Sequence, residues 1–219
     1  MDAKKFDELM KARHSVRCFQ KKEIPENTLK QIITTALQTP SWCNSQAWNI
    51  YVASGKTLSE IKNIYKTKSQ EKIKGYSDIE PGHRTEASQR SQKTMEQFFK
   101  GIAEFTKDPK MQALMDSQIS LFNAPTIVYL TLQKGVTQFS ILDLGALEMS
   151  ILLSAKSHGV DSLVAYECVK YPDVLRKFLK VHENENIIIG IALGYEDDNS
   201  INKFRSEKIS LDEACHFFN

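Results

Sequence analysis

The chain has 219 residues, of which 41% are hydrophobic and 26% are charged, and its net charge is +2. These proportions exclude a disordered, collagen-like or membrane-embedded protein, and a chain of this length can bury a core of its own. The charge balance excludes a general nucleic-acid coat but leaves room for one focused basic pocket. No CxxC pair occurs among the four cysteines, which are expected to be reduced thiols: Cys18, Cys43, Cys168 and Cys215.

Helical and extended patterns alternate along the first half of the chain. Apolar side chains at helical spacing predict helices over 2–13, from Pro25 to before Pro40, from about Thr57, and between Met95 and Phe105. Alternating apolar and polar residues predict a strand over 47–54. The stretch 66–90 is polar and rich in lysine, so we expect a mobile connection or lid there.

The second half carries three predicted strands, at 125–132, 161–166 and 186–194. A long helix is expected over 140–158, and Pro172 begins a shorter one. Because the long helix is apolar on all sides, it is expected to lie in the core or between two subunits. A capping pattern at Ser210 and Glu213 predicts one more helical turn. Few strands among many helices predict an α+β or α/β fold.

Several well-known motifs are missing from the sequence. It has no P-loop, no GxGxxG fingerprint, no HExxH or other His/Cys cluster for a metal, and no GxSxG nucleophile elbow. An enzyme with this sequence is therefore expected to use an organic cofactor and no metal. The amino terminus lacks a signal-peptide core, and the longest apolar run, 187–193, is too short to cross a membrane. We therefore expect a soluble, cytoplasmic protein.

A basic cluster at 13–19 has the residue types of a phosphate site. Arg13 and Arg17 flank Ser15, and arginine forks together with a hydroxyl group suit phosphate oxygens. Alone, the cluster is also typical of a solvated basic helix end.

An amide-rich cluster at 40–48 follows the proline that ends a predicted helix. The side chains of Asn44 and Gln46 both donate and accept hydrogen bonds, which suits the edge of a heteroaromatic ring or a ribityl chain. Alone, the cluster is also typical of a turn whose side chains bond to its own backbone.

Two further clusters lie in the second half. The segment 159–167 joins a helix cap to a short strand, and GYED at 194–197 is followed by Lys203 and Arg205. If the tail is extended, these two cations point the same way, because they are two residues apart. Alone, the clusters are also typical of an ordinary helix–turn–strand connection and a solvated tail.

Together the four clusters resemble the nitroreductase family of FMN-dependent oxidoreductases over nearly the full length. The two N-terminal signatures of that family are matched by RxSxRxF at 13–19 and PSxxNxQxW at 40–48. Asp143 and Gly145 match its central helix, 159–167 matches its flavin-side loop, and GYxD with KxR matches its C-terminal region.

The resemblance implies an α+β fold in a single domain over residues 1–219. Its parts would be a central, mostly antiparallel sheet flanked by helices, a variable lid or insert at about 66–120, and an extended C-terminal tail. The family forms intertwined homodimers with FMN at the interface, so the resemblance also implies a homodimer here.

The resemblance assigns residues to the two ends of FMN. Arg13, Ser15 and Arg205 would hold the phosphate, with Lys203 nearby and His14 supporting that end. Arg17 would lie near N1 and the C2 carbonyl of the ring, where a fixed cation favours the reduced flavin.

Other residues are implied to surround the ring. Asn44 and Gln46 would bond to the ring edge or the ribityl chain. The partner subunit would contribute Pro40, Ser41 and Trp42, and one face of the ring would be lined by Val164, Ala165 and Tyr166. Many relatives carry proline at the position of Val164, so the geometry next to N5 differs here.

The implied activity needs no catalytic side chain, because the flavin carries the chemistry. NADH or NADPH would pass hydride to the flavin, and a nitroaromatic, quinone or similar acceptor would then take it in a ping-pong mechanism. No nucleic acid or membrane partner is expected. The alternatives are a reductive dehalogenase or ene reductase of the same fold, a flavin-binding sensor or storage protein, and a module that binds another phosphate ligand.

Overall fold

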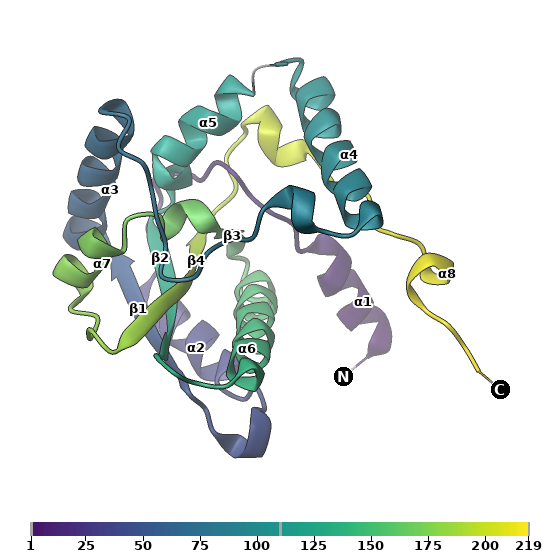
Figure 1. Cartoon of the computed structure of the whole chain (residues 1–219), viewed down its shortest axis with the longest axis horizontal. Coiled ribbons are helices and arrows are strands. Elements are labelled where there is room, and N and C mark those ends of the chain that lie inside the picture. Colours follow the sequence, from purple (N-terminus) through teal and green to yellow (C-terminus); the bar gives the residue numbers. More distant parts are fainter. Residues whose placement is uncertain (1, 110, 219) are drawn as a thin grey trace.

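The chain folds around a four-stranded antiparallel sheet, as a computed structural model that describes residues 2–109 and 111–218 shows (Figure 1). Every neighbouring pair of strands is antiparallel. Across the sheet the strands follow the order β1 (Trp48–Ser54), β2 (Thr126–Gln133), β4 (Glu185–Gly194) and β3 (Asp161–Ala165). The expected α+β class with an antiparallel sheet is confirmed.

The two central strands are the most deeply buried part of the sheet. All residues of β2 before Gln133 are buried, which agrees with the continuous apolar run in the sequence. Strand β4 pairs with β2 on one side and with β3 on the other. The outer strand β3 therefore ends beside the middle of β4, where Ala165 faces Gly190.

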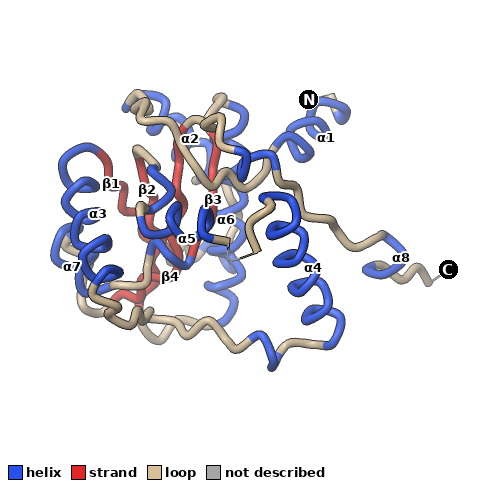
Figure 2. The backbone as a smooth tube through the Cα atoms, turned by 90° about the horizontal axis from the view of Figure 1, so that it is seen from above, coloured by secondary structure: helices blue, strands red, loops and turns tan. Residues whose placement is uncertain are grey.

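Helices cover both faces of the sheet (Figures 1 and 2). On one face, α3 and α7 pack against each other and against the first hydrophobic core. On the other face, α2 and α6 pack together over a second core. The helices are α1 (Ala3–Ala12), α2 (Glu26–Ala36), α3 (Gly55–Gln70), α4 (Gln89–Thr106), α5 (Gln112–Ile119), α6 (Gln138–Ser157), α7 (Pro172–Leu179) and α8 (Leu211–Ala214).

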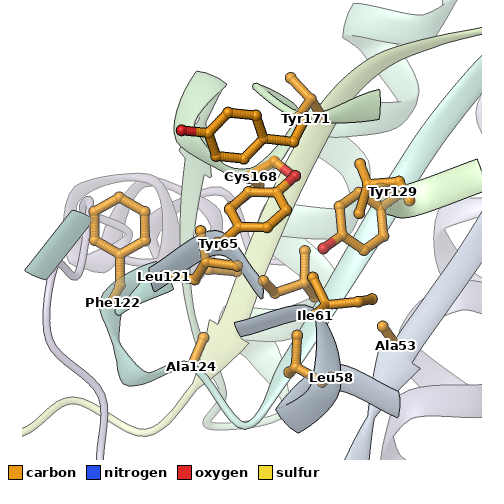
Figure 3. Packing of buried hydrophobic residues seen from close by; sticks show 14 of the residues in the cluster. Ala53, Leu58, Ile61, Tyr65, Leu121, Phe122, Ala124, Tyr129, Cys168 and Tyr171 are labelled. Carbon is orange, nitrogen blue, oxygen red and sulfur yellow. The ribbon is translucent and has the colours of Figure 1, made fainter. Parts of the chain in front are cut away.

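Three buried tyrosines characterise the first core (Figure 3). Tyr65 and Tyr171 pack edge to face with their ring centroids 4.9 Å apart, and the Tyr65 hydroxyl donates to the backbone oxygen of Cys168. A Cβ atom on Gly190 would lie 2.4 Å from the Cβ of Cys168. Strand β4 therefore needs glycine at this position so that the chain after β3 can pack on it.

The long apolar helix α6 is only half covered. Its inner side chains, among them Leu144, Leu147 and Ile151, are buried in the second core. Phe139, Ile141 and Leu142 on the same helix are exposed, Leu142 by 69%. By length and composition alone α6 could cross a membrane, a test that the core helix of a soluble protein also passes. The expected place in the core is confirmed for the inner side of α6, and the outer side is exposed in the single chain.

The segment expected to be a mobile connection, 66–90, is partly helical and partly fixed. Helix α3 runs on to Gln70, because its polar end still places Tyr65 in the core and Lys68 beside Asp173. Further on, Asp78 accepts hydrogen bonds from the backbone of Ile187 and from Arg176. The expectation of a connection is therefore wrong for 66–70, which is helical, and Asp78 has partners that the polar composition did not reveal.

The other departures concern the insert and the tail. Helix α4 begins at Gln89, before the first apolar periodic residue, and α5 was not expected at all. The predicted last helical turn is confirmed, because Ser210 and Glu213 form a capping box at α8. Figures 1 and 2 show the tail with α8 standing off the rest of the chain. A hydrogen bond from Arg90 to the backbone oxygen of Glu213 joins α8 to α4.

Candidate functional site

The N-terminal basic segment runs along the edge of the sheet formed by β3. The backbone N–H of Val16 donates to the oxygen of Ser162, 3.1 Å away, and Ser15 forms a parallel bridge with the same residue. Gln20 N–H donates to Tyr195 just after β4. These bonds bring three of the sequence clusters together at one end of the sheet: the basic cluster at 13–19, the segment 159–167 and the start of the C-terminal cluster at 194–197.

A single buried amide fixes the backbone at Arg17. Asn202, which is 1% exposed, accepts hydrogen bonds from the N–H groups of Arg17 and Cys18 at 2.7 and 3.1 Å. Its Nδ2 donates to the backbone oxygens of Cys18 and Asp197 at 2.7 and 3.0 Å. Asn202 therefore joins the N-terminal segment to the C-terminal one with a full set of hydrogen bonds.

Two arginines meet where these segments join. Arg17 donates to the backbone oxygen of Ser15, and its guanidinium carbon lies 5.6 Å from the ring centre of Phe98 on α4. Burial, and secondly the nearby charge of Arg205, lower the pKa of Arg17. Within the part of the chain that the structure describes, Arg205 donates only to backbone oxygens, those of Asn202 and Phe204.

The cations of this cluster lack acidic partners. Within residues 2–109 and 111–218, no ion pair within 4.0 Å is formed by Arg13, Arg17, Lys203 or Arg205. Bringing like charges together is unfavourable unless an anion neutralises them. The donor set that the structure brings together, the guanidinium groups of Arg17 and Arg205 next to Ser15, fits a phosphate group.

His14 and Lys203, the other two residues expected near the FMN phosphate, have different surroundings in the structure. The His14 ring is engaged within the chain: Nδ1 lies 2.9 Å from the oxygen of Ala12, and Nε2 lies 3.3 Å from Glu196. Lys203 is exposed and closes a 3₁₀ turn, Ser200–Lys203. The chain becomes extended only at Phe204, so Lys203 and Arg205 do not share one extended stretch as the spacing had suggested.

The residues expected along one face of the ring lie at the end of β3. Val164 packs partly in the second core and Ala165 partly in the first. Tyr166 begins the 3₁₀ turn Tyr166–Cys168 and is 37% exposed. This turn lines a hollow together with residues of α5.

The amide-rich loop 40–46 is fixed on α6. The Trp42 N–H donates to the Asp143 carboxylate at 3.0 Å, and the Trp42 ring stacks on Phe139 with centroids 5.9 Å apart. Gln46 donates from its backbone to Ser41 Oγ and from its side chain to Asn44 Oδ1, at 2.9 and 3.0 Å. Cys43, Asn44 and Gln46 all have positive φ, so this tight loop holds an uncommon backbone shape.

This loop does not join the other three clusters within the chain. In Figure 1 it lies between α2 and β1, at the end of the molecule away from α4 and α5. Beside it, Pro40 and Ser41 line a hollow of about 800 Å³ with Ile141 and Leu142. One chain therefore brings together the basic clusters and the end of β3, but not the residues at 40–46.

The sequence model of the Nitroreductase family matches residues 10–195. The chain belongs to the nitroreductase family. Among curated relatives, it is 23% identical to a 4-nitrobenzoate reductase of Pseudomonas putida over 97% of this chain and 95% of the relative. It is 25% identical to the nitroreductase NfnB of Mycolicibacterium smegmatis over 96% of this chain and 92% of the relative.

Solved structures of nitroreductases share the fold. The crystal structure of the FMN-dependent nitroreductase NfnB from Mycobacterium smegmatis in complex with NADPH superimposes with a TM-score of 0.91. It is 24% identical, and the match covers 99% of each chain. The sheet order and helices described above are therefore those of this nitroreductase fold.

The family motifs made the cations candidate site residues but gave no sign of two residues that contact them. Asn202 lies between GYxD and KxR, where an asparagine is equally typical of a loop. Phe98 belongs to the apolar stripe of α4, so its position over Arg17 gives no separate signal in the sequence. Both contacts join parts of the chain that are far apart in sequence.

Proposed function

We propose that this nitroreductase-family protein is an FMN-dependent enzyme that transfers hydride from NADH or NADPH to nitroaromatics, quinones or similar acceptors. The observation that carries the proposal is the pair Arg17 and Arg205, which lie near each other and form no ion pair within 4.0 Å among the residues that the structure describes. The relatives named above support it, because they are nitroreductases, and one solved relative is FMN-dependent and complexed with NADPH.

FMN, when bound, would supply the site that accepts and donates hydride. In this proposal Arg13, Ser15 and Arg205 bind its phosphate, and Lys203 adds positive charge nearby. His14 supports that end through its hydrogen bond with the oxygen of Ala12 and its contact with Glu196. Arg17, fixed through Asn202, places a permanent cation near the N1 edge of the ring.

The remaining residues would enclose the ring. Val164, Ala165 and Tyr166 line one face from the end of β3, so hydride donor and acceptor use the opposite face in turn. No side chain is needed as acid, base or nucleophile, and catalysis consists of positioning and electrostatics. This order of events predicts ping-pong kinetics.

We infer that the active form is a homodimer. The exposed face of α6, with Phe139, Ile141 and Leu142, is too apolar to face water, and the loop 40–46 is fixed on that helix. A two-fold pairing through this face brings Pro40, Ser41, Trp42, Asn44 and Gln46 of one chain to the other chain's cations. The tail with α8 then lies over the partner in an intertwined dimer.

The same proposal extends to the domain organisation, the cellular location and the partners of the protein. The whole chain, 1–219, acts as one domain, with the region 66–120 as a variable lid over the acceptor. The protein is cytoplasmic and has neither nucleic acid nor membrane as partner. Turnover of halophenols in place of nitroaromatics would favour a reductive dehalogenase of the same fold.

The phosphate site is tested by comparing FMN with riboflavin, which lacks the phosphate. Arg205→Gln should weaken FMN binding by about tenfold or more, because charge-assisted hydrogen bonds are worth about 1.5–3 kcal/mol each, and should leave riboflavin binding unchanged. Lys208→Gln, in the same tail, is the matched control. Flavin fluorescence titration measures both ligands; equal loss of FMN and riboflavin would contradict the assignment.

The order of substrates is tested by initial rates with both substrates varied. Ping-pong transfer predicts parallel lines in double-reciprocal plots of NADPH against a nitroaromatic acceptor. Intersecting lines would show that donor and acceptor bind at the same time, and would contradict the proposal that both use the same face of the flavin in turn.

A further inference from the structure

We propose that Phe98 of helix α4 is a positioning residue of the flavin site, whose ring holds the guanidinium group of Arg17 beside the flavin without neutralising its charge. This proposal rests on the proposed function, since Arg17 is taken to lie near N1 of FMN. Phe98 lies outside the family motifs described above. Through it, helix α4 of the lid region helps to set the reduction potential of the bound flavin.

Three contacts fix Arg17, and Phe98 makes one of them. Asn202 accepts a hydrogen bond from the backbone N–H of Arg17 at 2.7 Å, and the side chain of Arg17 donates from Nη1 to the oxygen of Ser15 at 3.1 Å. The guanidinium carbon of Arg17 lies over the ring of Phe98, 5.6 Å from the ring centre. This distance is within the range in which an aromatic ring attracts a cation. The first contact fixes the backbone, and the other two orient the charged group.

The charge that Phe98 contacts has no acidic partner. Neither Arg17 nor Arg205 forms an ion pair within 4.0 Å in residues 2–109 and 111–218. Burial, and secondly the charge of Arg205, lower the pKa of Arg17, so the surroundings disfavour its charged form. An aromatic face attracts a cation through its quadrupole but carries no net charge. Phe98 therefore stabilises the cation and leaves its full charge to act on the flavin, whereas a carboxylate in the same place would cancel it.

The ring of Phe98 is itself fixed in an aromatic cluster. It packs edge to face on Phe99 and on Phe204, with centroids 5.1 and 5.7 Å apart. Phe204 is 8% exposed and directly precedes Arg205 in the C-terminal motif. A Cβ atom on Gly101 of α4 would lie 3.4 Å from the Phe204 ring, so the helix approaches this ring closely. The position of Phe98 is therefore determined by packing.

The aromatic cluster joins α4 to the flavin site. Helix α4 packs on the C-terminal turn Ser200–Lys203, and Figures 1 and 2 show it away from the sheet. Ile102 of α4 and Phe204 belong to a small core separate from the two cores on the faces of the sheet. A movement of α4 would therefore take Phe98 away from Arg17. The position of this helix thus affects the cation beside the flavin ring.

The test is the two-electron reduction potential of the FMN-loaded protein, measured by equilibration with a reference dye. A fixed cation near N1 favours the reduced flavin, so Phe98→Leu should lower the preference for reduced over oxidised FMN about threefold to tenfold, the size of a partly buried cation–π contact. For a two-electron couple this corresponds to a potential about 15–30 mV more negative. Phe98→Tyr keeps an aromatic face and should keep the wild-type potential. Phe105→Leu is the matched control, because Phe105 packs on Phe204 from the same helix with centroids 5.8 Å apart, and it should leave the potential unchanged.

A second series of variants keeps the shape of the side chain and decides the question if Phe98→Leu does not fold. Phenylalanines with an increasing number of ring fluorines at position 98 weaken the negative face of the ring step by step, so the potential should fall step by step. In the background of Arg17→Gln, Phe98→Leu should shift the potential no further, because the cation that the ring holds is gone.

The outcomes separate this proposal from the proposed function. An unchanged potential across the fluorinated series overturns the role of Phe98. An equal shift in Phe105→Leu also overturns it, since the cause would then be a general loosening of α4. Failure of the wild type to bind FMN overturns the proposed function itself, whereas bound FMN whose potential is independent of the residue at position 98 overturns only this inference.

Discussion

Asn202 shows how much of this site depends on one side chain that contacts no proposed ligand. The side-chain amide of Asn202 forms hydrogen bonds with Arg17, Cys18 and Asp197, and the residue is buried. The site thus couples two ends of the chain that lie 185 residues apart in sequence. Arg17 has its place because Asn202 fixes the backbone beneath it.

Replacing Asn202 should therefore weaken folding and the site together. We expect Asn202→Ala to lower the free energy of unfolding by about 2–4 kcal/mol, because buried backbone groups lose their partners. Asn199→Ala, which removes only the cap of a short turn, should cost about 1 kcal/mol or less. Urea unfolding of both variants measures the difference, and equal losses would contradict the role of Asn202.

The buried thiol of Cys168 gives the protein a signature at alkaline pH. Burial, reinforced by Glu167, raises the pKa of Cys168 to about 12 from 9.0. Above pH 9 the unfolded thiol loses its proton while the folded one keeps it, so stability present below pH 9 is lost as pH rises toward 12. Lys62 acts in the opposite direction, because burial lowers its pKa to about 8.

Removing the thiol should flatten this decline. Between about pH 8 and pH 10, Cys168→Ala should lose about 1 kcal/mol less unfolding free energy than the wild type. Lys62 is present in both proteins, so its contribution largely cancels in the comparison. Cys43→Ala, at an exposed thiol, should decline like the wild type. The same pH slope in all three proteins would contradict the shift at Cys168.

At the scale of elements, the close approach of β4 and the turn after β3 shapes the site. Gly190 leaves room for Cys168, and this contact positions Tyr166 at the start of the same turn. Strand β4 needs a residue without Cβ there, although the sequence around it is otherwise rich in isoleucine. One glycine thus links the core to the residues proposed to line the flavin.

A methyl group at Gly190 should disturb both the packing of the core and the residues proposed to line the flavin. We expect Gly190→Ala to lower the unfolding free energy by about 1–3 kcal/mol, the usual effect of overpacking, and to weaken FMN binding. Gly82→Ala, whose nearest contact would be 3.8 Å from the Glu86 carboxylate, should change neither quantity appreciably. Thermal unfolding and FMN titration check both variants; a wild-type result for Gly190→Ala would contradict the packing argument.

Elements with an apolar stripe or a cap could be predicted from the sequence, and those without them could not. Helix α6 and the last turn at Ser210 carry such signals. Helix α5 buries only Leu114 and Ser117 and begins after a left-handed residue, so it shows no helical period. The sequence did not predict that α3 continues to Gln70, because the end of the helix is fixed by a partner in α7, Asp173, that is distant in sequence.

For the candidate site too, local motifs could be found in the sequence, but the way they come together in space could not. The arginines and the amide-rich loop belong to local motifs, so residue spacing made them candidates for the site. Their spatial relation was not predictable from spacing, since the loop 40–46 packs on α6 through Asp143 rather than joining the cations.

At the scale of the whole molecule, the exposed face of α6 is the feature that one chain leaves unexplained. Leu142→Asp places a charge on that face, where Leu142 is 69% exposed, so a monomer should tolerate it and a dimer interface should not. We expect the variant to sediment as a monomer and to bind FMN more weakly. Val52→Asp, at an exposed valine of β1, is the control and should stay dimeric. An unchanged dimer of Leu142→Asp would place the interface elsewhere.

The central claim is that this chain binds FMN and passes electrons from NAD(P)H to an acceptor. The most direct test is the visible spectrum of the FMN-loaded protein under anaerobic conditions, first with NADPH or NADH and then with nitrobenzene or 4-nitrobenzoate. We predict that the flavin band bleaches with the donor and returns with the acceptor. A protein that takes up no FMN, or a band that persists with both donors, would contradict the account.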